Sequence, residues 1–252
     1  CWLGIRFLNM LFNILTIFPS LFDALDHGVI GKAKKNGNFS IQLNDIRKHA
    51  VNKYGQIDGK PYGGGEGMVM MLEPLKKSLQ DIPKNKVGKV IYLSPQGIRL
   101  DNAKAKELSK EKAITFICGR YEGIDQRFID KYVDEEISIG DFIISGGEFA
   151  ALCTIDAIIR HIPGVLGNDN SSESDSFSNG LLKGPQYSRP EIFDEMEVPD
   201  ILLSGNHEKI KEWKELKSLE ATVNRRPDLL NNVKLTKKQK KLLEHLASQS
   251  IL

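Results

Sequence analysis

The chain has 252 residues, of which 40% are hydrophobic and 27% charged, enough for one large domain or for a larger and a smaller one with their own cores. Lys and Arg number 35 and Asp and Glu 33, so the formal net charge of +2 excludes a histone-like polycation and an acidic disordered chain. From residue 213 to residue 252, nine Lys or Arg stand against four acidic residues. This basic tail favours a polyanionic partner.

The uncharged run from Phe7 to Phe22 resembles the apolar part of a signal peptide, but polar residues interrupt it and no small-residue cleavage site follows. We therefore predict a buried strand over 11–18, with Pro19 in the first turn of a helix. Met10 is a candidate translation start, which would make residues 1–9 an upstream extension.

Cysteine and histidine spacing excludes several kinds of site. Cys1, Cys118 and Cys153 form no C-x-x-C pair, so neither a disulfide framework nor a zinc ribbon is indicated, and a reducing cytoplasm is expected. The five histidines show no H-E-x-x-H or similar ligand spacing, which leaves transition-metal catalysis without support.

Three segments repeat one pattern, in which a short apolar strand leads through a glycine-bearing loop into a helix. The predicted strands are 89–93, 113–118 and 136–139, and the loops that follow them are 94–97, 119–123 and 140–147. A buried helix is predicted from Glu148 to His161, ended by Pro163. Successive βα units predict an α/β fold with a mostly parallel sheet and ligand chemistry at the carboxyl ends of its strands.

The next segment, 168–180, reads NDNSSESDSFSNG and is a linker by composition, because it offers too little apolar surface to order itself. Beyond it, Asn206 is a candidate cap for a helix that carries Ile210, Trp213, Leu216 and Leu219, and Thr236 for a second helix ending near Leu246. These patterns predict a small helical C-terminal domain.

The glycine loops match no standard nucleotide fingerprint. Neither G-x-x-x-x-G-K-[ST] nor G-x-G-x-x-G is present, which argues against a P-loop NTPase and a dinucleotide-binding Rossmann enzyme. Three adjacent loops that expose backbone N–H and C=O groups suit a flat amphipathic ligand, and nearby apolar side chains would enclose an adenine ring. Those side chains are Leu93, Tyr121, Ile139, Phe142 and Ile144. The alternative is that the loops are only tight βα turns.

Several stretches together resemble the bacterial TrmD-type tRNA (guanine-N1)-methyltransferases, from Met10 to about Leu230. They are ILTIFP (14–19), KPYGGGEGMVM (60–70), YLSPQG (92–97), ICGRYEGID (117–125), SIGDFIISGGE (138–148), IPGVLG (162–167), DSF (175–177), GPQYSRP (184–190) and VPDILLSGNH (198–207). Two departures stand out, since Glu66 replaces a common proline and the tail after Leu230 is long and lysine-rich.

The resemblance implies the trefoil-knotted α/β fold of the SPOUT methyltransferases, an obligate homodimer, and S-adenosylmethionine bound by the knotted loops. It also implies a catalytic domain over 1–167, an interdomain linker over 168–180 and a helical tRNA-binding domain over 181–252. The cofactor residues that it implies are Leu93, Ser94, Pro95, Gly119, Tyr121, Glu122, Gly123, Ile139, Gly140, Asp141, Phe142, Ile143, Ile144, Gly146 and Gly147.

The implied reaction methylates N1 of the guanine at position 37, just 3′ of the tRNA anticodon. Neutral guanine carries a proton on N1, so a base must remove it and a partner must stabilise the charge that spreads to O6. The resemblance assigns these roles to Asp175 and Arg160. By default, however, an aspartate in a Ser-rich linker is solvated, and an arginine at a helix end complements the helix dipole.

Further expectations follow from the same resemblance. The linker of one subunit would cover the cofactor of the other and order only when tRNA binds, and Glu122 would help to position Mg²⁺. Basic C-terminal residues are expected to contact phosphates of the anticodon stem-loop, although any single lysine is by default part of a solvated helix face balanced by glutamates. KPYGGGEGM is expected to form part of the guanine pocket. Membrane and DNA are not expected partners.

Two other functions compete with the methyltransferase. One is an RNA-binding protein that keeps the fold without catalysis, against which Asp175 and Arg160 both argue. The other is a nucleotide-hydrolysing switch built on Gly63–Gly67, which lacks the lysine and hydroxyl that phosphates and magnesium require.

Overall fold

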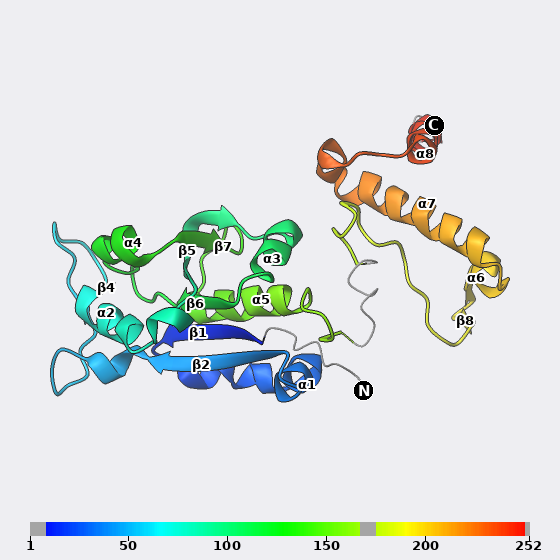
Figure 1. Ribbon diagram of the computed structural model, residues 1–252. Helices are drawn as coiled ribbons and strands as arrows, with labels where there is room; N and C mark the ends of the chain where they lie inside the picture. The colour runs from blue at the N-terminus through cyan, green and yellow to red at the C-terminus, as the bar shows by residue number, and fades with distance from the viewer. Residues whose placement is uncertain (1–8, 167–174, 250–252) are drawn as a thin grey trace. The chain divides into compact units, whose positions relative to one another are not determined.

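A computed structural model describes residues 9–166 and 175–249. The chain divides into two compact units, Cys1–Asp169 and Asn170–Leu252, which are described separately (Figure 1). Among the described residues, none forms a helix long and apolar enough to cross a membrane.

The first unit is built on a five-stranded sheet of order β2-β1-β6-β5-β7, in which every pair of neighbouring strands is parallel. The strands are β1 Met10–Thr16, β2 Phe39–Asp45, β5 Lys89–Arg99, β6 Ala113–Ile117 and β7 Glu135–Ser138. A separate antiparallel pair joins β3 Asp58–Gly59 to β4 Val69–Met70. The predicted parallel sheet and its three βα units are therefore confirmed.

Both faces of the sheet are covered, because successive side chains of a buried strand point to opposite sides. Ile14 belongs to a core packed against one set of helices, whereas its neighbour Leu15 belongs to a second core on the other face. The first set is η1 Pro19–Asp26, α1 Gly28–Lys35, α3 Asn102–Leu108 and α5 Gly147–Ile159, and the second is η2 Ile46–His49, α2 Leu72–Gln80 and α4 Gln126–Tyr132. A short 3₁₀ turn, η3 Lys84–Lys86, precedes β5.

The strand predicted over 11–18 is present, but its bounds differ from the prediction. The strand ends at Thr16 rather than at residue 18, because the Thr16 hydroxyl accepts a hydrogen bond from the Phe18 backbone N–H (2.9 Å) and turns the chain. Pro19 opens the following helix as expected, although this helix is of the 3₁₀ type.

Strand β5 runs past its predicted end at Leu93. Leu93 and Ile98 both pair with Ile137 of β7, so residues 94–97 are looped out of the ladder as a bulge. A Cβ on Gly97 would collide with the Glu136 backbone, which explains why glycine allows the chain to rejoin β7. The predicted loop thus exists, but it lies within a strand and not after one.

The second unit contains an antiparallel hairpin and several helices. Its elements are β8 Ile192–Phe193, β9 Met196–Glu197, α6 Asp200–Leu203, α7 His207–Arg225, η5 Pro227–Asn232 and α8 Lys237–Gln249. The Asn206 side chain accepts from Lys209 N–H (3.1 Å) and caps α7, and Thr236 caps α8 through Gln239 N–H (3.2 Å). Both predicted caps are therefore confirmed.

The predicted linker over 168–180 falls partly outside the described residues, which resume at Asp175. From there the chain differs from expectation and forms a hydrogen-bonded turn, in which Phe177 N–H donates to Leu181 C=O (2.7 Å). Leu181 is buried, and Leu182 N–H donates to Thr222 of α7 (2.9 Å). The Ser218 hydroxyl of α7 also donates to Leu182 C=O, so hydrogen bonds at Leu182 attach this part of the chain to α7.

Candidate functional site

The three glycine loops line one cavity of about 370 Å³ at the carboxyl edge of the parallel sheet. One wall comes from the β5 bulge, a second from the loop after β6 and a third from the loop after β7. The predicted residues among those lining the cavity are Leu93, Ser94, Pro95, Gly119, Tyr121, Glu122, Gly123, Ile139, Gly140, Phe142, Ile143, Ile144, Gly146 and Gly147. The loops are therefore neighbours in space as well as similar in sequence.

The cavity departs from the predicted set in two ways. Asp141 is exposed and is not among the lining residues. Conversely, Tyr92, Arg120 and Ser138 line the cavity although the sequence does not single them out. In sequence, Tyr92 has the pattern of a residue inside a strand and Arg120 that of an ordinary loop residue. No local pattern therefore distinguishes these cavity-lining residues from their neighbours.

Tyr92 supplies a neutral phenol to this cavity. Burial raises its pKa to about 12, with a smaller contribution from the charge of Glu136, while a hydrogen bond with the Ile124 backbone acts in the opposite direction. A Cβ atom on Gly119 would lie only 2.8 Å from the nearest carbon of the Tyr92 ring. Glycine at 119 therefore lets the loop close over Tyr92.

Two loops of the cavity are joined through their backbones. Gly147 N–H donates to Gly119 C=O (2.8 Å), and a Cβ on Gly147 would come within 2.9 Å of the Cys118 Cα. Tyr121 has φ +60°, a conformation that non-glycine residues adopt only under constraint. The backbone of this part of the cavity is consequently fixed rather than freely variable.

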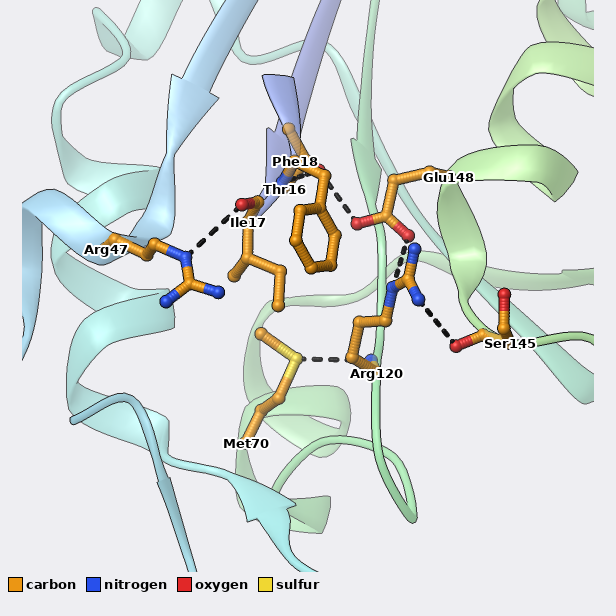
Figure 2. A network of polar contacts seen from close by, with 8 residues as sticks. All are labelled: Thr16, Ile17, Phe18, Arg47, Met70, Arg120, Ser145 and Glu148. Atoms are coloured by element: carbon orange, nitrogen blue, oxygen red, sulfur yellow. Dashed lines mark hydrogen bonds and ion pairs between the residues drawn. The ribbon is translucent and has the colours of Figure 1, made fainter. Parts of the chain in front are cut away.

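A buried polar network adjoins the same loops (Figure 2). Glu148 is fully buried, and its two carboxylate oxygens accept from the Thr16 hydroxyl and from Arg120 Nε, each at 2.8 Å. Arg120 also donates to Ser145 C=O (2.9 Å). The centre of the Phe18 ring lies 4.6 Å from the Arg120 guanidinium carbon, a distance that favours a cation–π contact.

Cys118 lies beside this network but has no nucleophilic character. Burial, reinforced by the charge of Glu148, holds the pKa of its thiol well above the usual value. Because the thiolate is the reactive form, Cys118 acts as a small buried apolar residue. Burial and the raised pKa therefore argue against covalent catalysis by this cysteine.

The glycine-rich segment around residues 60–67 is attached to the second cavity loop. Glu122 N–H donates to Met68 C=O (2.9 Å), and the Tyr62 side chain is wholly exposed. Gly63, Gly64 and Gly65 all have positive φ, which glycine alone adopts without strain. Among the described residues no group of three His, Cys, Asp or Glu side chains is arranged to hold a metal ion.

The two residues assigned to chemistry lie in different units. Arg160 is exposed and forms the C-cap of α5. Asp175 is half-buried at the start of the second unit and has the Lys183 ammonium 3.3 Å from its Oδ1.

These features define an α/β protein with a glycine-lined cavity, of the size of a small-molecule site, at the carboxyl edge of a parallel sheet. A profile of the family described as tRNA (guanine-1)-methyltransferase TrmD matches residues 10–232. The chain therefore belongs to this family of methyltransferases.

Curated relatives support the assignment over nearly the whole chain, and each is named tRNA (guanine-N(1)-)-methyltransferase. The protein from Clostridium novyi (strain NT) is 50% identical over 235 residues, covering 93% of this chain and 97% of the relative. That from Pseudoalteromonas translucida (strain TAC 125) is 52% identical over 234 residues, covering 92% of each. That from Psychromonas ingrahamii is 48% identical over 247 residues, covering 96% of this chain and all of the relative.

Proposed function

We propose that the protein transfers a methyl group from S-adenosylmethionine to N1 of guanine 37 in tRNA. The observation that carries the proposal is the meeting of three glycine loops around one cavity in a chain whose family is described as tRNA (guanine-1)-methyltransferase. Acting on tRNA, the protein would work in the cytoplasm.

The cavity suits S-adenosylmethionine. Its volume of about 370 Å³ lies within the range of small-molecule sites, about 300–1,000 Å³. Leu93, Ile139 and Ile144 offer apolar surface to an adenine ring, and glycine backbone groups offer hydrogen bonds to its polar edge. Bound there, S-adenosylmethionine would supply an electrophilic methyl group on its sulfonium.

Residues of this chain would perform the proton chemistry. The Asp175 carboxylate would accept the N1 proton of guanine as N1 becomes methylated, which frees the N1 lone pair for attack. The Arg160 guanidinium stabilises the negative charge that develops on O6. Tyr92, neutral below its pKa of about 12, takes no part as a base.

We further propose that the active site is assembled from two chains in a homodimer with the trefoil-knotted SPOUT fold. Arg160 is the C-cap of α5 in the first unit and Asp175 lies near the start of the second. The family resemblance implies that the segment that carries Asp175 in one chain lies over the cofactor of the other. The knot itself is proposed from the family resemblance alone. The second unit would bind the anticodon stem-loop through its basic helices.

The test measures methyl transfer from labelled S-adenosylmethionine to tRNA transcripts that carry guanine or adenine at position 37. We expect activity on the guanine transcript alone, and its loss in Asp175→Asn, because an amide cannot accept the proton. The fall expected is about 10²–10⁴-fold, as for other general bases. Asp200→Asn, an exposed carboxylate in the same unit, is the matched control and is expected to keep full activity.

Other outcomes decide against parts of the proposal. If wild-type protein binds both S-adenosylmethionine and tRNA yet transfers nothing under any magnesium concentration, it is an RNA-binding protein that keeps the fold. If Asp175→Asn retains activity, another group is the base. Removal of Mg²⁺ with a chelator tests the assignment of Glu122, since a required ion would make activity depend on added magnesium.

A further inference from the structure

Glu148 is the second residue of α5 and lies beneath the cavity without lining it. A wholly buried carboxylate is costly, and replacing a buried ion pair by apolar side chains is often neutral or stabilising. A contribution to folding stability is therefore a weak explanation for the presence of the Glu148–Arg120 ion pair. Its contacts suggest a geometric role instead.

Arg120 connects two ligand-cavity loops through this carboxylate. It lies in the loop after β6, directly before Tyr121, and its side chain is 16% exposed. Its guanidinium donates both to Glu148 and to the carbonyl of Ser145 in the loop after β7 (Figure 2). A Cβ on Gly146 would collide with this guanidinium, so the Arg120 side chain fills the space between the loops at this point.

The second carboxylate oxygen fixes the pair to the sheet. Thr16, the last residue of β1, donates to Glu148 Oε1 (2.8 Å), and the same hydroxyl accepts from Phe18 N–H (2.9 Å). Phe18 in turn packs against the Arg120 guanidinium. The network therefore ties the position of both loops to the end of a central strand.

We propose that Glu148, acting through Arg120, is a positioning residue that sets the spacing of the loops at 119–123 and 140–147 and hence the affinity for S-adenosylmethionine. The identity of the ligand in this inference rests on the proposed function, whereas the role of Glu148 rests on the hydrogen bonds described above. It predicts that loss of the charge pair weakens ligand binding out of proportion to any loss of stability.

The experiment measures the dissociation constant for S-adenosylmethionine by calorimetry and stability by urea unfolding, for full-length Glu148→Gln, Arg120→Met and the double variant Arg120→Met/Glu148→Met. Each is expected to raise the dissociation constant about tenfold or more, since small misplacements of binding groups are costly. The double variant leaves no unpaired buried charge, so it is expected to fold with stability close to wild type.

Glu135→Gln is the matched control. Glu135 is a largely buried carboxylate of the same unit, paired with Lys89 and Lys104, and it does not line the cavity. It is expected to lower stability while changing the dissociation constant by less than about twofold, as for a distant and independent site. Equal loss of affinity in Glu135→Gln, or normal affinity in the double variant, would overturn the proposal.

Amide hydrogen exchange separates failure of this inference from failure of the proposed function. Without any ligand, Glu148→Gln is expected to speed exchange of Gly147 N–H, which is bonded to Gly119 C=O, relative to amides of β1. Unchanged exchange at Gly147 contradicts the positioning role. Wild-type protein that binds no S-adenosylmethionine contradicts the proposed function, whatever the exchange result.

Discussion

Single side chains set the chemical character of the cavity. Tyr92 and Cys118 are both titratable, yet burial keeps the phenol and the thiol neutral by raising the pKa of each. The charged groups of the adjoining network, Arg120 and Glu148, neutralise each other. Glu122 and Glu136 also line the cavity, so carboxylates are available for recognition together with backbone groups and shape.

The phenol of Tyr92 gives a prediction for alkaline pH. Its pKa rises from 10.0 to about 12 on folding, so between these values the folded chain keeps a proton that the unfolded chain has released. Stability is therefore present below pH 10 and falls as pH rises toward 12, by about 2–3 kcal/mol. Urea unfolding across this range should show a shallower decline in Tyr92→Phe, and an equal decline in both proteins would contradict the assignment.

At the scale of elements, the regular part of the fold could be predicted from sequence, because strand and helix periods are local. The parallel strands, the α7 cap at Asn206 and the start of η1 at Pro19 all follow from neighbouring residues. The contact between Thr16 and Glu148 spans 132 positions, and no local pattern encodes it. The bulge in β5 could not be predicted either, because the strand continues beyond it only by pairing with β7.

The candidate site shows the same division. The glycine loops can be recognised in the sequence, because clustered glycines mark places where the backbone must turn tightly or approach a neighbour closely. Arg120 and Tyr92 enter the cavity only because strands β5 and β6 are adjacent. Asp141 belongs to the same loop but does not line the cavity, because membership of a loop does not decide which side chains face inward.

The start of β7 provides a prediction at acidic pH. Burial tends to raise the pKa of Glu135, but hydrogen bonds from Lys104 and Lys89 outweigh it and leave the pKa below its usual 4.5. The stability that this carboxylate contributes is present above pH 4.5 and is lost as pH falls through the lower folded value. Glu135→Gln should lower the free energy of unfolding by about 1–3 kcal/mol at neutral pH. It should also reduce the loss of stability at acidic pH, as measured by urea unfolding at a series of pH values.

The whole molecule raises the question of how many chains make one site. If Arg160 and Asp175 act across a homodimer, Asp175→Asn and Arg160→Met chains are each inactive alone, but a heterodimer of the two restores one intact site. An equal mixture after subunit exchange should recover about a quarter of wild-type activity, since half the dimers are mixed and each has one working site. No recovery, with exchange shown independently, would place both residues in one chain's site.

Charge on the second unit leads to a prediction about tRNA affinity. Lys240 and Lys241 are exposed on α8, and removal of a lysine that neutralises one phosphate should lower the slope of log affinity against log salt by roughly 0.7–0.9. Lys240→Gln/Lys241→Gln is therefore expected to weaken tRNA binding and flatten its salt dependence. Lys84→Gln/Lys86→Gln, exposed in η3, is the paired control, and an identical effect there would indicate non-specific attraction.

The position of β1 within the sheet has a consequence for synthesis of the protein. This strand pairs with β2, which begins at Phe39, but its other neighbour is β6, which begins only at Ala113. A chain emerging from the ribosome can therefore form one edge of the sheet early, while the other edge of β1 stays open until β6 has emerged. Completion of the sheet is then a late, long-range event, of the kind that makes folding slow and leaves a nascent chain reliant on protection from aggregation.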